Sequence, residues 1–196
     1  STNCHRLKKK AVIVPMAMGK SYQKARSPYP LKVINYIIAV SSLRKSSRVL
    51  DIGCGTGKST IPFAKKVYSI LGIDPSKKMI KEAKAVSKKY KNIFYKLSSF
   101  EALKLHKESF DLIFAGTSFH WLNPKIRYKK SSYLLKDKGR LVVFWSVDAH
   151  NKSRFMQKVR KIYLKKAPKY PVGYGNSERK FLRELKKGTR IVSVQY

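Results

Sequence analysis

The sequence is short of cysteine, of acidic residues and of long apolar runs. Its 196 residues include only Cys4 and Cys54 as cysteines, so neither a disulfide framework nor a cysteine-rich metal site is expected. The four histidines are scattered without the spacing of zinc ligands. No apolar run approaches the roughly 20 residues that a membrane-spanning helix needs. The sequence therefore predicts one globular domain in a reducing, cytoplasmic compartment, with a core drawn from its 43% hydrophobic residues.

The shortage of acids leaves the chain strongly basic. Ten Asp and Glu face 45 Lys and Arg, which gives a net charge of +35, and such a field attracts polyanions. The excess is spread evenly along the chain, however, and 34 of the basic residues are lysine. Specific reading of bases and phosphates favours the bidentate guanidinium of arginine. A nucleic-acid partner is therefore left open but not favoured, because a general lysine bias produces the same pattern.

The most informative stretch is residues 49–57, Val-Leu-Asp-Ile-Gly-Cys-Gly-Thr-Gly. Glycines at every second position after a run of β-formers are typical of a buried parallel strand that enters a tight turn close to a ligand. The even spacing differs from the G-x-G-x-x-G pattern of dinucleotide cradles and suits a cofactor without a pyrophosphate. We therefore expect these positions to bind a cofactor: Asp51, Gly53, Gly55 and Gly57.

A second acid, Asp74, closes the next predicted strand, residues 67–73, and lies 23 residues after Asp51. An acid about 20 positions on commonly holds a ribose diol, because one carboxylate can accept from both hydroxyl groups. The alternative is a capping or turn residue before Pro75. Ser76 is the expected N-cap of the following helix, whose apolar stripe includes Met79.

Three more apolar segments predict the remaining strands of a sheet. They are residues 93–97, the run that begins at Phe110, and residues 139–145, and predicted helices at 31–40, 76–90 and 123–135 separate the segments. Strands that alternate with helices at this spacing predict an α/β, Rossmann-like, doubly wound and mainly parallel sheet.

In chain order these features resemble the class I S-adenosylmethionine-dependent methyltransferases over about residues 20–147. The leader at 22–30, Ser-Phe-His-Trp at 118–121 and Gly-Arg-Leu-Val-Val-Phe-Trp at 139–145 are similar to the trans-aconitate methyltransferase-like (methyltransferase type 11) branch. Serine and proline are exchanged in the leader, and Lys138 replaces a glycine of that branch.

The resemblance implies S-adenosylmethionine as the cofactor. The family's corner after the third strand usually reads Asp-Ala-Glu, and its first acid accepts from the adenine amino group. Here the corner reads Ser99-Phe100-Glu101, so a serine hydroxyl would replace that acid, and Glu101 is equally well explained as a helix N-terminal acid. The resemblance also implies cofactor contacts at Met79 and Ala115.

The resemblance divides the single domain into three parts. They are an N-terminal helical cover (1–45), a cofactor-binding core (46–147) and a helical insertion with a last strand (148–196). Within the cover, the apolar segment at 11–18 is expected to pack over the site. Within the last part, residues 151–170 and 177–187 are expected to be helical and residues 190–195 to form a strand. We expect the sheet to lack the family's final strand or strands, and a dimer would cover the edge thus exposed.

The expected enzyme methylates a small, anionic acceptor at a carboxylate oxygen, because a carboxylate is already deprotonated and needs no strong base. Arg26 would clamp the anion and Tyr22 would close the pocket. His120 would line the pocket, or act as a base if the acceptor were a hydroxyl or an amine. The alternatives are methylation of RNA or another polyanion, and a catalytically weak binding protein derived from the fold.

Overall fold

A computed structural model describes residues 11–18, 29–148, 158, 165 and 191–193 of the chain. Seven of its segments form one sheet in the order β4-β3-β2-β5-β6-β1-β7, and every recorded strand pair is parallel. The strands are β1 (Ala11–Met18), β2 (Arg48–Ile52), β3 (Ser69–Asp74), β4 (Ile93–Leu97), β5 (Phe110–Gly116), β6 (Leu135–Asp148) and β7 (Ile191–Ser193). The predicted doubly wound, parallel architecture is confirmed.

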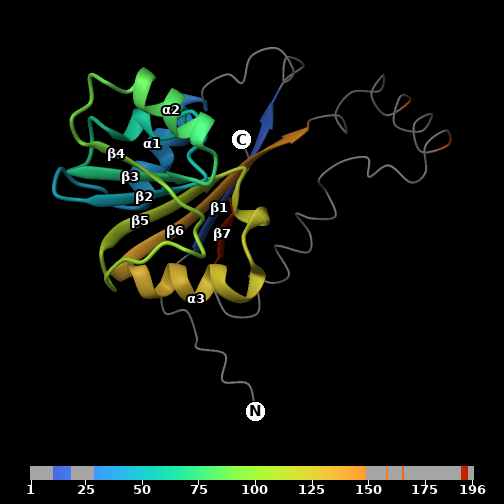
Figure 1. The fold of residues 1–196 in the computed structure, drawn as a ribbon. Coiled ribbons are helices and arrows are strands. Elements are labelled where there is room, and N and C mark those ends of the chain that lie inside the picture. The colour runs from blue at the N-terminus through green and yellow to red at the C-terminus, as the bar shows by residue number, and fades with distance from the viewer. Residues whose placement is uncertain (1–10, 19–28, 149–157, 159–164, 166–190, 194–196) are drawn as a thin grey trace.

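Helices cover both faces of this sheet (Figure 1). Helices α1 (Leu31–Val40) and α2 (Lys77–Val86) lie on one face, and α3 (Pro124–Leu134) lies on the other. Short 3-10 helices, η1 (Ile61–Phe63) and η2 (Phe119–Trp121), follow the glycine turn and β5. The predicted bounds of α1 and β4 match those observed, whereas β6 is longer than expected because it begins directly after α3.

Alternation along the strands divides the core between the two faces. Val49 packs with Val33 and Ile37 of α1, whereas its neighbour Leu50 packs with Leu134 of α3 and with Phe119. All six side chains are at most 2% exposed. Burial of both faces explains why β2 reads as a continuous apolar run rather than as an alternating one.

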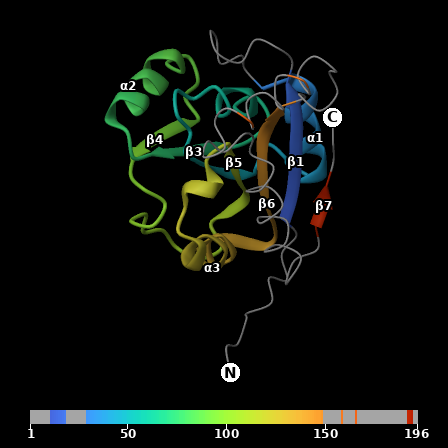
Figure 2. The same cartoon turned by 90° about the vertical axis from the view of Figure 1, so that its right-hand side faces the viewer.

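Residues 11–18 correct one expectation. They form strand β1 and not part of a helical cover over the site. β1 pairs with β6 along its whole length, from Ala11–Leu141 to Met18–Asp148, and β7 pairs with its first three residues on the other side (Figure 2). Pro15 lies beyond the part of β1 that pairs with β7, so no described strand on that side needs its missing amide hydrogen. The expected last strand at 190–195 is confirmed as β7, and the helices expected at 151–170 and 177–187 fall almost wholly outside the described residues.

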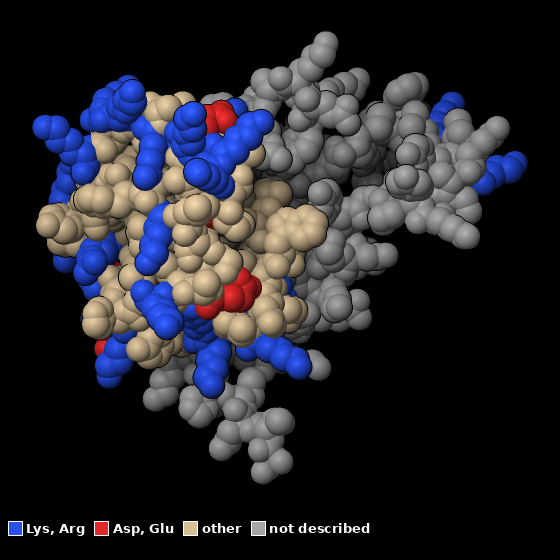
Figure 3. Space-filling view, viewed as in Figure 1, with Lys and Arg blue, Asp and Glu red and all other residues tan. Residues whose placement is uncertain are grey.

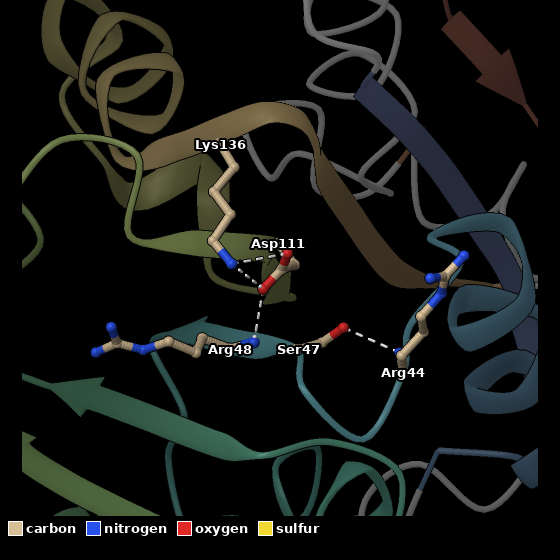
Figure 4. A network of polar contacts seen from close by, with 5 residues as sticks. All are labelled: Arg44, Ser47, Arg48, Asp111 and Lys136. Carbon is tan, nitrogen blue, oxygen red and sulfur yellow. Dashed lines mark hydrogen bonds and ion pairs between the residues drawn. The ribbon is translucent and has the colours of Figure 1, made fainter.

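The amino-terminal edge of the central strands is held by Asp111 (Figure 4). Its Oδ2 accepts a hydrogen bond from the backbone N–H of Arg48 at 2.8 Å, and Lys136 Nζ lies 3.0 and 2.9 Å from its two oxygens. One carboxylate on β5 therefore contacts both neighbouring strands, β2 and β6. The preceding turn is closed by Ser47 Oγ, which accepts from the N–H of Arg44 at 2.9 Å.

Among the described residues, no helix is long and apolar enough to cross a membrane. Nor do the described residues bring together three or more His, Cys, Asp or Glu side chains in a cluster that would hold a metal ion.

Candidate functional site

The glycine turn leaves β2 at the carboxyl edge of the sheet, where the chain order reverses between β2 and β5. Ligands of doubly wound sheets bind at such a switch point. Gly53, Gly55 and Gly57 have φ angles of +69°, +53° and +82°, a region that other residues enter only with strain. The turn is tied to β3 because the N–H groups of Gly53 and Cys54 both donate to the Ile73 carbonyl, at 2.8 and 3.0 Å.

The three glycines face different surroundings. A Cβ on Gly53 would lie 2.5 Å from the Cβ of Ser118, and one on Gly57 would lie 2.6 Å from the hydroxyl of Tyr95. A Cβ on Gly55 would meet no atom within 4 Å. Gly53 and Gly57 are therefore required by packing within the protein, whereas Gly55 exposes its backbone to an open space.

Asp74 lies beside that space. Its Oδ2 accepts from the N–H of Gly55 at 3.0 Å, and its Oδ1 accepts from the N–H of Ser76 at 2.8 Å. Each carboxylate oxygen can accept a second hydrogen bond. Because the side chain is half-buried, with one edge toward solvent, Asp74 can bind the glycine turn and a ligand diol at once.

Asp51 lies beneath the turn and is fully buried. Its Oδ2 accepts from Ser59 Oγ at 2.9 Å and from Thr60 Oγ1 at 2.7 Å, while its Oδ1 is buried without a hydrogen-bond partner among the described residues. Burial raises the pKa of Asp51 to about 7, although the two hydroxyl groups oppose the shift and Asp74 adds to it slightly. Asp51 therefore supports the turn from beneath, and none of its side chain is exposed at the surface.

Cys54, within the turn, has a structural role. It is 4% exposed, and burial raises the pKa of its thiol well above the ordinary value. A thiol that stays protonated is a poor nucleophile.

The corner after β4 is arranged differently from the expectation. Ser99 Oγ accepts from the N–H of Ala102 at 3.2 Å, and Phe100 lies in the core at 2% exposure. Glu101 Oε1 accepts from the N–H of Asn123 at 2.9 Å, directly before α3, and Lys130 Nζ donates to the Glu101 carbonyl at 2.8 Å. This contact supports the interpretation of Glu101 as a helix N-terminal acid.

The end of β5 borders the glycine turn. Ala115 is completely buried in the core, so the cofactor contact expected at this residue has no exposed surface in this structure. Ser118 Oγ donates to the carbonyl of Ile52, which locks this segment against Gly53. Thr117 has a φ of +57°, which is unusual for a β-branched residue, and its hydroxyl lies 3.2 Å from that of Tyr29.

His120 lies in η2, next to this segment. Partial burial and the nearby Arg127 guanidinium lower the pKa of the His120 imidazole, which favours its neutral form. Arg127 is itself buried, and its Nη1 donates to the carbonyl of Phe119 at 3.2 Å. Trp121 is 78% exposed beside His120, at 4.8 Å between ring centroids.

The structure thus brings the three glycines, Asp51 and Asp74 to one edge of the sheet. Met79 lies in the first turn of α2, where its N–H donates to Ser76 Oγ at 3.4 Å, and the N–H of Ser76 in turn donates to Asp74. Tyr22 and Arg26 lie outside the described residues. Two residues that support the glycine turn, Ser118 and Tyr95, have no role predicted from the sequence. Ser118 belongs to the Ser-Phe-His-Trp motif at 118–121, which was a usable signal, whereas no motif marks Tyr95.

Comparison with known proteins agrees with this geometry. Residues 49–139 match the family model described as a methyltransferase domain. A Dictyostelium discoideum protein described as a methyltransferase is 33% identical over 130 residues, which cover 66% of this chain and 47% of that protein. A Saccharomyces cerevisiae protein described as S-adenosylmethionine-dependent methyltransferase CRG1 is 30% identical over 130 residues, covering 63% and 43%. The chain therefore spans less than half the length of both relatives.

A solved structure shares the fold. The YcgJ protein of Bacillus subtilis superposes with a TM-score of 0.54 and 27% identity, over 60% of this chain and 50% of that one. The family match covers the strand, glycine turn and carboxylates described above, and the superposition shows that the fold around them is shared. Residues 49–139 therefore form a methyltransferase domain of the class I, S-adenosylmethionine-dependent kind.

Proposed function

We propose that this chain binds S-adenosylmethionine at the carboxyl edge of β2 and β3 and transfers its methyl group to a small, anionic acceptor, at a carboxylate oxygen. The observation that carries the proposal is the open space at Gly55 beside the half-buried carboxylate of Asp74. The amino-acid end of the cofactor can approach the main chain closely at a glycine, because no side chain is in the way. Its ribose diol fits the remaining acceptor positions of the Asp74 carboxylate.

The residues present fit this cofactor electrostatically. S-adenosylmethionine carries a sulfonium and an ammonium against one carboxylate, so a protein of net charge +35 repels it unless the pocket is locally negative. Asp51 and Asp74 lie close enough for the charge of one to shift the pKa of the other. Two of the ten acids of the chain therefore concentrate negative charge at this turn.

In the proposed mechanism, the protein aligns two reactants and tunes the field around them. The cofactor supplies an electrophilic methyl group for in-line displacement. Asp74 would hold the ribose, the turn around Gly55 would hold the amino-acid end, and the Ser99–Phe100 corner would border the adenine. An acceptor carboxylate attacks without losing a proton, so this site needs no strong base.

The η2 side of the site supports an anionic acceptor. Arg127 places a buried guanidinium close enough to lower the pKa of His120, so this side is electropositive where the turn is electronegative. A neutral His120 would orient the acceptor, and we retain Arg26 and Tyr22 as the proposed clamp and pocket closure. If the acceptor were a hydroxyl or an amine, neutral His120 would instead be the base.

The test is a calorimetric titration of the nucleic-acid-free full chain with S-adenosylmethionine, followed by a screen of small carboxylates for S-adenosylhomocysteine formation. Asp74→Ala should abolish saturable binding, whereas the matched control Asp137→Ala, which removes an exposed acid, should bind like the wild type. Circular dichroism establishes that both variants fold. Absence of binding by the folded wild-type chain would overturn the proposal, and turnover limited to polyanions would overturn the choice of acceptor.

A further inference from the structure

A second hollow lies away from the methyl-transfer site, between the end of α2 and the beginning of β4, and we name it the α2–β4 groove. Its volume is about 340 Å³, within the range of small-ligand sites. It is lined by Lys84, Ser87, Lys88, Tyr90, Ile93, Phe94 and Tyr95.

The groove adjoins the cofactor edge at Tyr95, whose hydroxyl lies next to Gly57, and extends from there toward the beginning of β4. Of the β4 residues that line it, Ile93 pairs with Ile70, near the amino end of β3, whereas Asp74 at the carboxyl end of β3 pairs with Leu97. β4 is also the first strand in the sheet order, so one side of the groove opens at the sheet edge.

The surroundings of the groove are strongly basic. Residues 77–97 contain eight lysines and a single acid, Glu82. Figure 3 shows lysine and arginine side chains gathered over α2. Lys84 and Lys88 line the groove itself, and both side chains are exposed. Basic side chains in this arrangement favour an extended anion, because each neutralised phosphate releases condensed counterions.

Aromatic rings lie among these lysines. Phe94 is 56% exposed, an unusual position for a large apolar ring, and its side chain lies at the sheet edge on the face opposite to those of Ile93 and Tyr95, because neighbouring strand residues alternate. Tyr90 and Tyr95 are half-buried in the groove itself. Lys89 Nζ lies 5.3 Å from the centroid of the Tyr90 ring. Exposed rings next to cations are the features with which proteins bind single-stranded nucleic acid, because bases stack on the rings and phosphates follow the cations.

Hydrogen bonds hold this groove in shape. Asn92 Nδ2 donates to the carbonyls of Ala64 and Val67, at 2.6 and 3.1 Å, which fixes the turn before β4. Ser87 Oγ donates to the carbonyl of Ala83 at 2.7 Å, which fixes the end of α2. A ligand therefore meets rings and lysines whose supporting backbone is already ordered, and binding requires little further ordering.

We propose that the α2–β4 groove and the adjoining sheet edge bind single-stranded nucleic acid, with phosphates beside Lys84 and Lys88 and bases stacked on Tyr90 and, across the edge of β4, on Phe94. An acidic peptide would satisfy the lysines, but it would leave the exposed rings without a matching partner. This proposal does not depend on the identity of the methyl acceptor, because none of the residues proposed to bind the acceptor lines the groove.

The experiment is fluorescence anisotropy of the full chain with a fluorescein-labelled 12-nucleotide oligouridylate, at several salt concentrations. The double variant Lys84→Gln/Lys88→Gln is compared with Lys104→Gln/Lys107→Gln, which removes the same charge from exposed positions outside the groove. We expect the groove variant to bind at least tenfold more weakly and to lower the slope of log K against log salt by about 1.4. The control should change affinity less than threefold.

A ring variant separates stacking from charge. Phe94→Leu should weaken binding at least fivefold and leave the salt slope unchanged, because it removes a stacking surface and no charge. Photo-cross-linking of a 4-thiouridine oligonucleotide to the wild-type chain should label residues 84–97 and does not depend on any variant folding. Equal losses in the two double variants, an unchanged affinity in Phe94→Leu, or stronger competition by polyglutamate than by unlabelled oligouridylate would each overturn the proposal.

Discussion

Replacing Asp51 with asparagine should change how the stability of the cofactor-free protein depends on pH. Burial raises the pKa of Asp51 from 3.8 to about 7, so the folded state holds a proton on this carboxyl that the unfolded state has already lost. The contribution of Asp51 to the stability of the folded state is therefore most favourable below pH 4, and it is lost as the pH rises through about 7.

The magnitude follows from the size of the shift. One pKa unit corresponds to about 1.4 kcal/mol, so the unfavourable contribution of Asp51 grows from about 2 kcal/mol at pH 5 to about 4 kcal/mol at pH 8. For a chain of this length, that increase of about 2 kcal/mol lowers the melting temperature by about 4–8 °C. Asp51→Asn cannot ionise, so this part of the pH dependence should disappear.

The assay measures thermal unfolding from pH 5 to pH 8 for the wild type, Asp51→Asn and Glu82→Gln. The asparagine amide can still accept from Ser59 and Thr60, but its NH₂ group lacks an obvious acceptor, which costs about 1–3 kcal/mol at every pH. The informative quantity is therefore how the melting-temperature difference changes with pH, and not its value at one pH. Glu82→Gln removes the same charge from an exposed helix position. A constant difference between wild type and Asp51→Asn across this range would refute the reasoning.

Three further predictions follow from the same geometry. Gly53→Ala should destabilise the fold by about 2–5 kcal/mol in urea unfolding, because its Cβ would overlap Ser118. Gly55→Ala should cost only about 1–2 kcal/mol yet abolish cofactor binding in calorimetry. Equal stability losses in the two variants would contradict this distinction. The affinity for S-adenosylmethionine should rise with pH through about 7 and binding should release protons, because a cationic ligand favours ionised Asp51. Asp51→Asn should lack this pH dependence, and a wild-type affinity that does not change with pH would count against the coupling. Asp111→Ala should lower the free energy of unfolding by about 1–3 kcal/mol, because it leaves the N–H of Arg48 without its acceptor. Lys136→Met should lower it by less than about 1 kcal/mol, because the Lys136–Asp111 ion pair is partly exposed. A larger loss in Lys136→Met than in Asp111→Ala would show that the ion pair dominates.

Local sequence determined much of the fold and the centre of the site. The glycine spacing after Asp51 identified the turn, because only glycine enters positive φ without strain. The position of Asp74 at the end of the next strand could be predicted from its distance along the chain. The apolar pattern and Ser76 located α2, since a cap and a helical stripe are properties of consecutive residues.

The tertiary structure decided what depends on distant contacts. Residues 11–18 became a strand because β6 offers a matching partner more than 100 positions along the chain, and no local pattern records that pairing. The pKa of Asp51 depends on burial beneath the turn, and the difference between Gly53 and Gly55 depends on Ser118 from the segment that follows β5. Periodicity and turn chemistry are local and can be read from sequence, whereas burial, register and open space arise only when separate segments pack together.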